Sequence, residues 1–248
     1  MIEKRKKEKA MIYSIENKIL KATVDTSGAQ LQSIYSKATE TEYLWQGDPA
    51  YWAGRAYNLF PTIGRMYKNT YTYDGNEYSL RCHGIARYRA FQLTDRTATK
   101  LTFRLTEDED SLKEYPFKFE FFIRYELTEA PLEISLIVKN TDEKELIFAL
   151  GGHPGFNVPF GNGAFEDYYL EFSEKTKVLF HTLSESKFMT GEKLPLPLTE
   201  GVRLPLRHEL FDNDAAILGN TCREISLKSK ADPRYITVKY PDFRYLGV

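Results

Sequence analysis

The sequence predicts an all-β protein, built as a large antiparallel β-sandwich. Short apolar and β-branched runs recur along nearly the whole chain, and turn signals separate them. Leu101, Phe103 and Leu105 alternate with polar residues, which is the period of a half-buried strand. Only residues 206–211 indicate a helical turn, and we find no internal repeat or low-complexity linker. Strands without intervening helices favour a sandwich or barrel.

The expected strands follow one another with short connections. Asp74 and Gly75 form an Asp-Gly pair, which is a hairpin signal, and the polar stretch 139–142 ends one strand before the next run begins. We expect strands at 19–24, 31–35, 67–73, 78–80, 101–106, 117–127, 132–138, 146–150, 168–172, 177–180, 215–218, 225–227 and 235–240.

The length favours one folded domain with a short leader. All-β folds of about 200–250 residues often form a single domain, so we expect one sandwich domain over residues 11–248. Residues 1–10 are charged, with almost no apolar side chains, and we expect them to be a disordered leader. A nucleic-acid-binding tail is the alternative, but Glu3 and Glu8 interrupt its short basic cluster.

Charge and cysteine content exclude several classes of partner. Lys and Arg number 34 against 35 for Asp and Glu, so no net charge draws the protein to nucleic acid or to an anionic membrane. Cys82 and Cys222 lie far apart, which indicates neither a disulfide framework nor a zinc site. No apolar run has the length of a membrane span, and the N-terminus lacks the apolar core of a signal peptide. We predict a cytoplasmic protein with a small, neutral ligand.

Two histidines stand beside chain-breaking residues. The apolar run 146–150 leads into paired glycines, His153 and Pro154, so we expect the strand to end at the histidine. His83 precedes Gly84 in a similar context. Glycine lets the backbone bend and lets other groups approach, so imidazoles at these places are expected to face a cleft. For each histidine alone, a structural role is the alternative.

Arg65 adds a donor to this pair. It follows a glycine, between an apolar run and an expected strand, and alone it would be interpreted as a surface arginine. Together, the arginine is a hydrogen-bond donor and the two histidines are proton-transfer groups, which ordinarily titrate at about 6.5. The set contains no nucleophile and lacks the carboxylates that a metal needs. Such a set suits acid–base chemistry on hydroxyl groups, and we expect no cofactor or metal.

Other catalytic assignments have less support. Neighbours on a strand point to opposite faces, so Cys82 is expected to be a small buried thiol and not a nucleophile paired with His83. His181 and His208 lie in polar sequence surroundings and lack metal-ligand spacing. The sequence holds neither a phosphate-binding glycine loop nor a Gly-x-Ser-x-Gly elbow.

Taken together, five segments resemble the aldose 1-epimerases, or galactose mutarotase-like proteins, in their shorter bacterial branch. The segments are 42–48, 59–65, 82–87, 115–117 and 152–156, within a resemblance that runs from residue 12 to the end. It implies a large β-sandwich, the mutarotase-like supersandwich, with a sugar cleft across one sheet. It also implies an isomerase of carbohydrate metabolism that interconverts the α and β anomers of a free aldohexose. A base takes the C1 hydroxyl proton while an acid protonates the ring oxygen, and the ring opens and closes without a cofactor.

The resemblance assigns roles to four residues. His153 would be the acid at the ring oxygen, and His83 would hydrogen-bond the sugar and support the charge change. Arg65 would fix hydroxyl positions. Asp214 matches the sugar-binding aspartate of the family, although Asp212 is close enough to leave the register open. A turn residue at the entry to a strand is an equally good interpretation of Asp214.

Two departures from the family pattern affect the expected activity. The family's general base is a glutamate near the C-terminus, and it has no counterpart in this sequence. Residues 240–248 read as part of a strand, so we expect a chain that lacks its C-terminal strand or strands and has little epimerase activity. Gly64 and Gly152 stand where the galactose-type branch has asparagine, so galactose is not assumed to be the substrate.

Two other functions stay open. A carbohydrate-binding or regulatory protein of the same fold would keep the cleft and lack turnover. A hexose-6-phosphate 1-epimerase would need a pair of basic side chains at the cleft rim. Arg87 and Arg89 are candidates for that pair, although solvation at the surface explains them equally well. A monomer and a homodimer are both compatible with the sequence.

Overall fold

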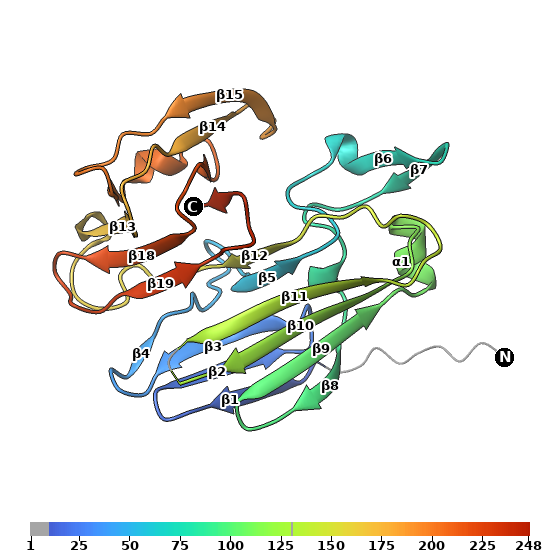
Figure 1. Cartoon of the computed structure of the whole chain (residues 1–248), viewed down its shortest axis with the longest axis horizontal. Helices are drawn as coiled ribbons and strands as arrows, with labels where there is room; N and C mark the ends of the chain where they lie inside the picture. The colour runs from blue at the N-terminus through green and yellow to red at the C-terminus, as the bar shows by residue number, and fades with distance from the viewer. Residues whose placement is uncertain (1–9, 130) are drawn as a thin grey trace. The chain divides into compact units, whose positions relative to one another are not determined.

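The computed structural model describes residues 10–129 and 131–248 (Figure 1). Contacts divide the chain into two compact units, Met1–Asn157 and Val158–Val248. All but Ala10 of the predicted leader lies outside the described residues. The single domain over residues 11–248 stays a prediction.

The first unit contains two four-stranded antiparallel sheets around one core. At alternating positions β10 buries one row of side chains, including Phe121, Ile123 and Tyr125, while Val24 and Leu31 enter the same core from the other sheet. This arrangement confirms the predicted sandwich for this unit. The sheets are β1 (Ile12–Glu16), β2 (Leu20–Asp25), β3 (Gln30–Ser36) and β4 (Thr41–Glu42), and, in spatial order, β11 (Leu132–Asn140), β10 (Phe119–Leu127), β9 (Lys100–Thr106) and β8 (Gln92–Arg96).

Two-stranded ribbons and short helical segments connect these sheets. In the β6–β7 hairpin, Asp74 and Gly75 have φ angles of 49° and 74°, the left-handed values of a type I′ turn, so the hairpin signal is confirmed. The elements are β5 (Ala56–Leu59) paired with β12 (Gly151–Pro154), β6 (Thr70–Tyr73) paired with β7 (Asn76–Ser79), the 3₁₀ turns η1 (Tyr67–Asn69) and η2 (Ala86–Tyr88), and the helix α1 (Glu109–Glu114).

The second unit also contains two four-stranded antiparallel sheets. The turn expected at 206–211 is confirmed by η4 (His208–Phe211), and η3 (Phe165–Asp167) precedes the first strand. The sheets, in spatial order, are β16 (Arg203–Pro205), β13 (Tyr168–Phe172), β18 (Glu224–Ser229) and β19 (Ile236–Lys239), and β15 (Met189–Pro195), β14 (Leu179–Leu183), β17 (Ile217–Gly219) and β20 (Leu246–Gly247).

Three expectations about elements were wrong. Residues 146–150 are not a strand; β12 begins at Gly151 and passes through the histidine to Pro154. Proline is tolerated at this position because, among the described strands, β12 pairs with β5 alone. A backbone N–H that points away from β5 would have no strand to bond, so proline, which lacks this N–H, loses no ladder hydrogen bond. Residues 67–69 form η1, and α1 was not expected. None of the helices in the described ranges is long and apolar enough to cross a membrane.

Candidate functional site

The β5–β12 ribbon presents His153 on its outer face. His153 lies directly opposite Tyr57 in the antiparallel register, so the two side chains share one face. The neighbouring Asn58 is buried, and its side-chain amide donates to the carbonyls of Gly28 and Ala29 at 3.1 and 2.9 Å. Since Asn58 fixes one face of the ribbon to the sandwich, the opposite face, with His153, is held at the surface.

His83 lies in a turn tied to the end of β5. His83 and Gly84 have φ angles of 68° and 75°, both in the left-handed region. The Phe60 carbonyl accepts backbone N–H groups from Ile85 and Ala86, at 2.8 and 3.1 Å. These bonds fix the turn beside the last residues of β5.

Backbone bonds to Gly64 orient the His83 ring. The His83 N–H donates to the Gly64 carbonyl at 2.7 Å, and the Gly64 N–H donates to His83 Nδ1 at 3.1 Å. Because Nδ1 accepts a hydrogen bond, the proton of the neutral imidazole lies on Nε2. His83 can therefore offer an Nε2–H donor to a ligand.

The two histidines lie in one cluster with two aromatic side chains. The His83 and His153 ring centroids are 5.5 Å apart, with the rings at 73°. Trp52 lies 5.1 Å from His153, and Tyr57 lies 6.2 Å from His153 and 5.4 Å from Trp52. We call Trp52, Tyr57, His83 and His153 the imidazole cluster. It places two proton-transfer groups beside apolar ring faces.

Arg87 lies beside this cluster and affects its charge. Its guanidinium carbon is 3.6 Å from the centroid of the Tyr57 ring, a cation–π contact, and also stacks 4.9 Å from Tyr88. The pKa of His153 is lowered, mainly because nearby protein atoms remove water from the imidazolium, and additionally because Arg87 is positively charged. A hydrogen bond with its own backbone opposes this shift. The neutral form of His153 is therefore favoured.

Replacing Arg87 with glutamine is expected to raise the pKa of His153. The substitution removes a positive charge that disfavours the imidazolium, so the protonated form persists to higher pH. NMR titration of the histidine ring signals measures the change. Arg81→Gln is the matched control, because Arg81 stacks on Tyr88 at 3.9 Å and does not contribute to the pKa shift of His153. Equal titration curves for the parent chain and Arg87→Gln would show that Arg87 does not influence His153.

Of the other two predicted site residues, Arg65 lies close in the chain to this cluster and Asp214 belongs to the second unit. Arg65 is exposed and directly follows Gly64, whose peptide makes both bonds to His83. Asp214 is exposed, has a φ of 77°, and accepts the Ala215 N–H at 3.0 Å. Asp212, the alternative, is exposed at the end of η4. The sugar-binding role of either aspartate stays a prediction.

The expectation for Cys82 needs correction, and the other two histidines take different positions. Cys82 lies in the same turn as His83, so strand alternation does not apply to it, and it is half-buried. His181 lies in β14 and is 5% exposed. His208 is exposed and stacks on Phe165 at 4.4 Å. Across residues 10–129 and 131–248, no group of three or more His, Cys, Asp or Glu side chains is arranged to hold a metal ion.

Sequence reasoning missed the two aromatic members of the imidazole cluster. Tyr57 alternates with the buried Ala56 and Asn58, and this local pattern indicates that its ring faces the other way. Trp52 lies in the turn region before β5, where no local pattern predicts its contact with His153. The site therefore depends on a pairing between segments about 95 residues apart.

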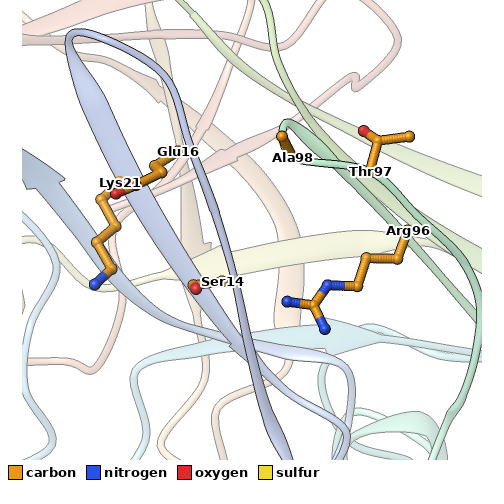
Figure 2. A pocket seen from close by; sticks show the side chains of 6 residues that line it. All are labelled: Ser14, Glu16, Lys21, Arg96, Thr97 and Ala98. Carbon is orange, nitrogen blue, oxygen red and sulfur yellow. The ribbon is translucent and has the colours of Figure 1, made fainter.

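A hollow on the first unit lies apart from the imidazole cluster. It has a volume of about 480 Å³ and is formed by the β1–β2 hairpin and the end of β8 (Figure 2). Its charged side chains include Glu16, whose carboxylate pairs with Lys37 at 3.0 Å. The lining residues are Ser14, Glu16, Lys21, Arg96, Thr97 and Ala98. Since none of them is a histidine or an aromatic residue, this hollow is not the candidate catalytic site.

Comparisons with known proteins place the chain in a family. A family model described as Aldose 1-epimerase matches residues 11–239. The protein LacX, encoded on a plasmid of Lactococcus lactis subsp. lactis, is 31% identical over 242 residues, which cover 94% of this chain and 81% of LacX.

Two solved structures are also similar. A galactose mutarotase-like protein from Lactobacillus casei has a TM-score of 0.89 at 34% identity, over 96% of this chain and 82% of that one. A galactose mutarotase related enzyme from Lactobacillus acidophilus has a TM-score of 0.83 at 32% identity, over 96% and 84% of the two chains. The chain is therefore a β-rich, mutarotase-like member of the aldose 1-epimerase family, which supports an isomerase-type function on sugars.

Proposed function

We propose that the protein is an aldose 1-epimerase that interconverts the α and β anomers of a free aldohexose by acid–base ring opening. The observation that carries this proposal is the approach of His83 and His153, at 5.5 Å between ring centroids, from two separately anchored segments. Imidazoles exchange protons near neutral pH, and an uncharged sugar needs no counter-ion. The rings of Trp52 and Tyr57 supply apolar faces beside them.

Each site residue has a distinct role in this proposal. His153 protonates the ring oxygen as the ring opens and takes the proton back as it closes. His83 donates from Nε2 to the sugar, since its Nδ1 already accepts from Gly64. Arg65 binds hydroxyl groups, and the same role for Asp214 stays a prediction from the sequence. With the prediction that the family's glutamate base has no counterpart among the 248 residues, the chain supplies the sugar-binding groups and the acid but not the base.

A small external carboxylate is expected to replace the base. Polarimetry of freshly dissolved α-glucose or α-galactose should show little acceleration by the purified 248-residue chain in sodium chloride, and more in sodium formate at equal ionic strength. Formate can accept the C1 hydroxyl proton in place of the glutamate. Formate without protein gives the background rate. Saturable sugar binding with no acceleration in either salt would contradict the enzyme and favour the carbohydrate-binding alternative.

The pH dependence of the reaction distinguishes the two roles of an imidazole. If His153 is the acid, its protonated form is required, so the formate-supported rate should rise as the pH falls toward its lowered pKa, below the ordinary value of 6.5. Rates are compared at a constant concentration of ionised formate. A rate that instead falls on acidification through this range would assign His153 as a base.

The structure gives less support to a hexose-6-phosphate 1-epimerase. Arg89 pairs with Glu114 at 2.7 Å and with Asp108 at 3.4 Å, so its charge is already balanced. Arg87 alone does not form the expected basic pair. Preference for glucose over glucose 6-phosphate in the polarimetric assay is therefore expected. The cytoplasmic location and the choice between monomer and homodimer stay predictions.

The positions of Gly64 and Gly152 bear on sugar preference. A Cβ at Gly64 would have no atom within 4 Å, and one at Gly152 would have only Pro154 Cδ, at 4.0 Å. Lack of space therefore does not explain why glycine stands at these two positions. We propose a broader sugar preference than that of the galactose-type branch, which has asparagine at both positions.

A further inference from the structure

The second unit has a hollow of about 540 Å³ on one face of its β15–β14–β17–β20 sheet. Leu179 and His181 of β14 point to this face, and Lys193 of β15 lies opposite His181 in the strand register. Gly219 of β17, opposite Leu179, completes the floor. The hollow is lined by Leu179, His181, Lys193, Gly219, Asn220, Thr221, Arg223, Arg244 and Tyr245.

His181 is a buried polar side chain without a hydrogen bond. Only 5% of its surface is exposed, and no residue in the described ranges hydrogen-bonds its imidazole. It has one ring contact, edge-on with Tyr245 at 5.2 Å. A Cβ at Gly219 would lie 2.6 Å from His181 Nε2, so this nitrogen sits directly over the glycine that lines the hollow. Neither ring nitrogen is fully enclosed by protein atoms, so the imidazole can hydrogen-bond a ligand in the hollow.

Three cations line the same hollow as His181, and none has a carboxylate partner among the described residues. Within the part of the chain that the structure describes, Lys193, Arg223 and Arg244 make no ion pair, and the lining contains no Asp or Glu. Arg223 donates from Nη1 to the Pro241 carbonyl at 2.6 Å, which holds its guanidinium in place. Positive charge without a neutralising carboxylate, in a hollow that also offers an imidazole, favours anion binding.

We propose that this hollow binds a phosphate-bearing small molecule. The phosphate would accept hydrogen bonds from His181, Lys193 and the two arginines, which supply donors and no competing carboxylate. A hollow of about 540 Å³ is in the range of small-molecule sites and larger than a phosphate group alone needs. The half-exposed ring of Tyr245 and the Leu179 side chain are available to the rest of the molecule. This site is independent of the proposed epimerase chemistry.

Calorimetric titration of the 248-residue chain tests the proposal. Phenyl phosphate and inorganic phosphate are titrated in a buffer of fixed ionic strength. We expect saturable binding that the double variant Lys193→Gln/Arg244→Gln weakens by about tenfold or more, because each charged hydrogen bond contributes roughly that factor. The control is Lys230→Gln/Arg96→Gln, which removes the same charge from exposed positions outside this hollow and should leave binding unchanged.

NMR on the unmodified chain tests the role of His181 without a substitution that could disturb the core. Its imidazole signals should shift during the phenyl phosphate titration, while those of the exposed His208 should not. Binding that both double variants weaken equally, or that leaves the His181 signals unchanged, would overturn the site. Equal affinities for phenyl phosphate and inorganic phosphate would overturn the small molecule as the ligand.

Discussion

Replacing His153 with alanine is expected to lower the formate-supported rate of anomer exchange by about 10²- to 10⁴-fold, the usual contribution of a positioned proton-transfer group. The substitution removes the group proposed to protonate the ring oxygen and leaves the Nε2–H of His83, which is proposed to bind the sugar. Stability should change little, because His153 is exposed and backbone pairing with β5 holds its strand. Polarimetry at several protein concentrations separates the enzymic rate from spontaneous mutarotation.

His208→Ala is the matched control for this experiment. His208 is also exposed and also stacks on an aromatic ring, but it belongs to the second unit and has no proposed role. Its removal should leave the rate unchanged. Thermal unfolding of both variants by circular dichroism shows whether the fold persists. If His153→Ala retained the full formate-supported rate, the acid would have to be a different residue.

Strands with strict alternation could be predicted from the sequence. The expected strand 168–172 coincides with β13, and 101–106 differs from β9 by one residue, because each buries alternate side chains against a core. The run 146–150 is apolar but has no strand partner there; instead the Ala149 N–H donates to the Pro61 carbonyl at 2.8 Å. Composition alone does not distinguish an apolar run that forms a strand from one that does not, because strand pairing depends on segments far away in the sequence.

The helix α1 shows the limit of periodicity for short elements. Six residues complete less than two turns, so no apolar stripe develops. Its signal is the cap: the Asp108 carboxylate accepts the Ser111 N–H, and the Ser111 hydroxyl accepts the Asp108 N–H. A search for reciprocal caps would have found this helix in the sequence.

Only part of the candidate site could be predicted from the sequence, because some of its residues lie in local patterns that indicate bends and others do not. Gly84 beside His83, and Gly152 and Pro154 beside His153, indicate bends, and the structure brings the two histidines together. Tyr57 and Trp52 join them only through the register of β5 against β12, which no local pattern determines. With 14% aromatic residues in the chain, composition did not single out these two.

Gly84→Ala is expected to destabilise the protein by roughly 2–5 kcal/mol and to disturb the His83 turn. Part of the cost, about 1–2 kcal/mol, comes from placing alanine at a φ of +75°. The remainder, about 1–3 kcal/mol, comes from overpacking, because the new Cβ would lie 2.3 Å from the Phe60 carbonyl oxygen, a backbone atom that cannot rotate away. Guanidinium unfolding followed by circular dichroism measures the free energy of unfolding.

Gly75→Ala isolates the backbone part of this cost. Gly75 has almost the same φ, +74°, and a Cβ there would have no atom within 4 Å, so only the left-handed strain of about 1–2 kcal/mol is expected. The difference between the two variants therefore measures how firmly the His83 turn is held against the end of β5. Because a displacement of about 1 Å can cost 10²-fold in rate, Gly84→Ala should also slow anomer exchange, whereas Gly75→Ala should not. Equal free energies of unfolding for the two variants would mean that the turn can move away from Phe60, and His83 would then lack the fixed position that its proposed role requires.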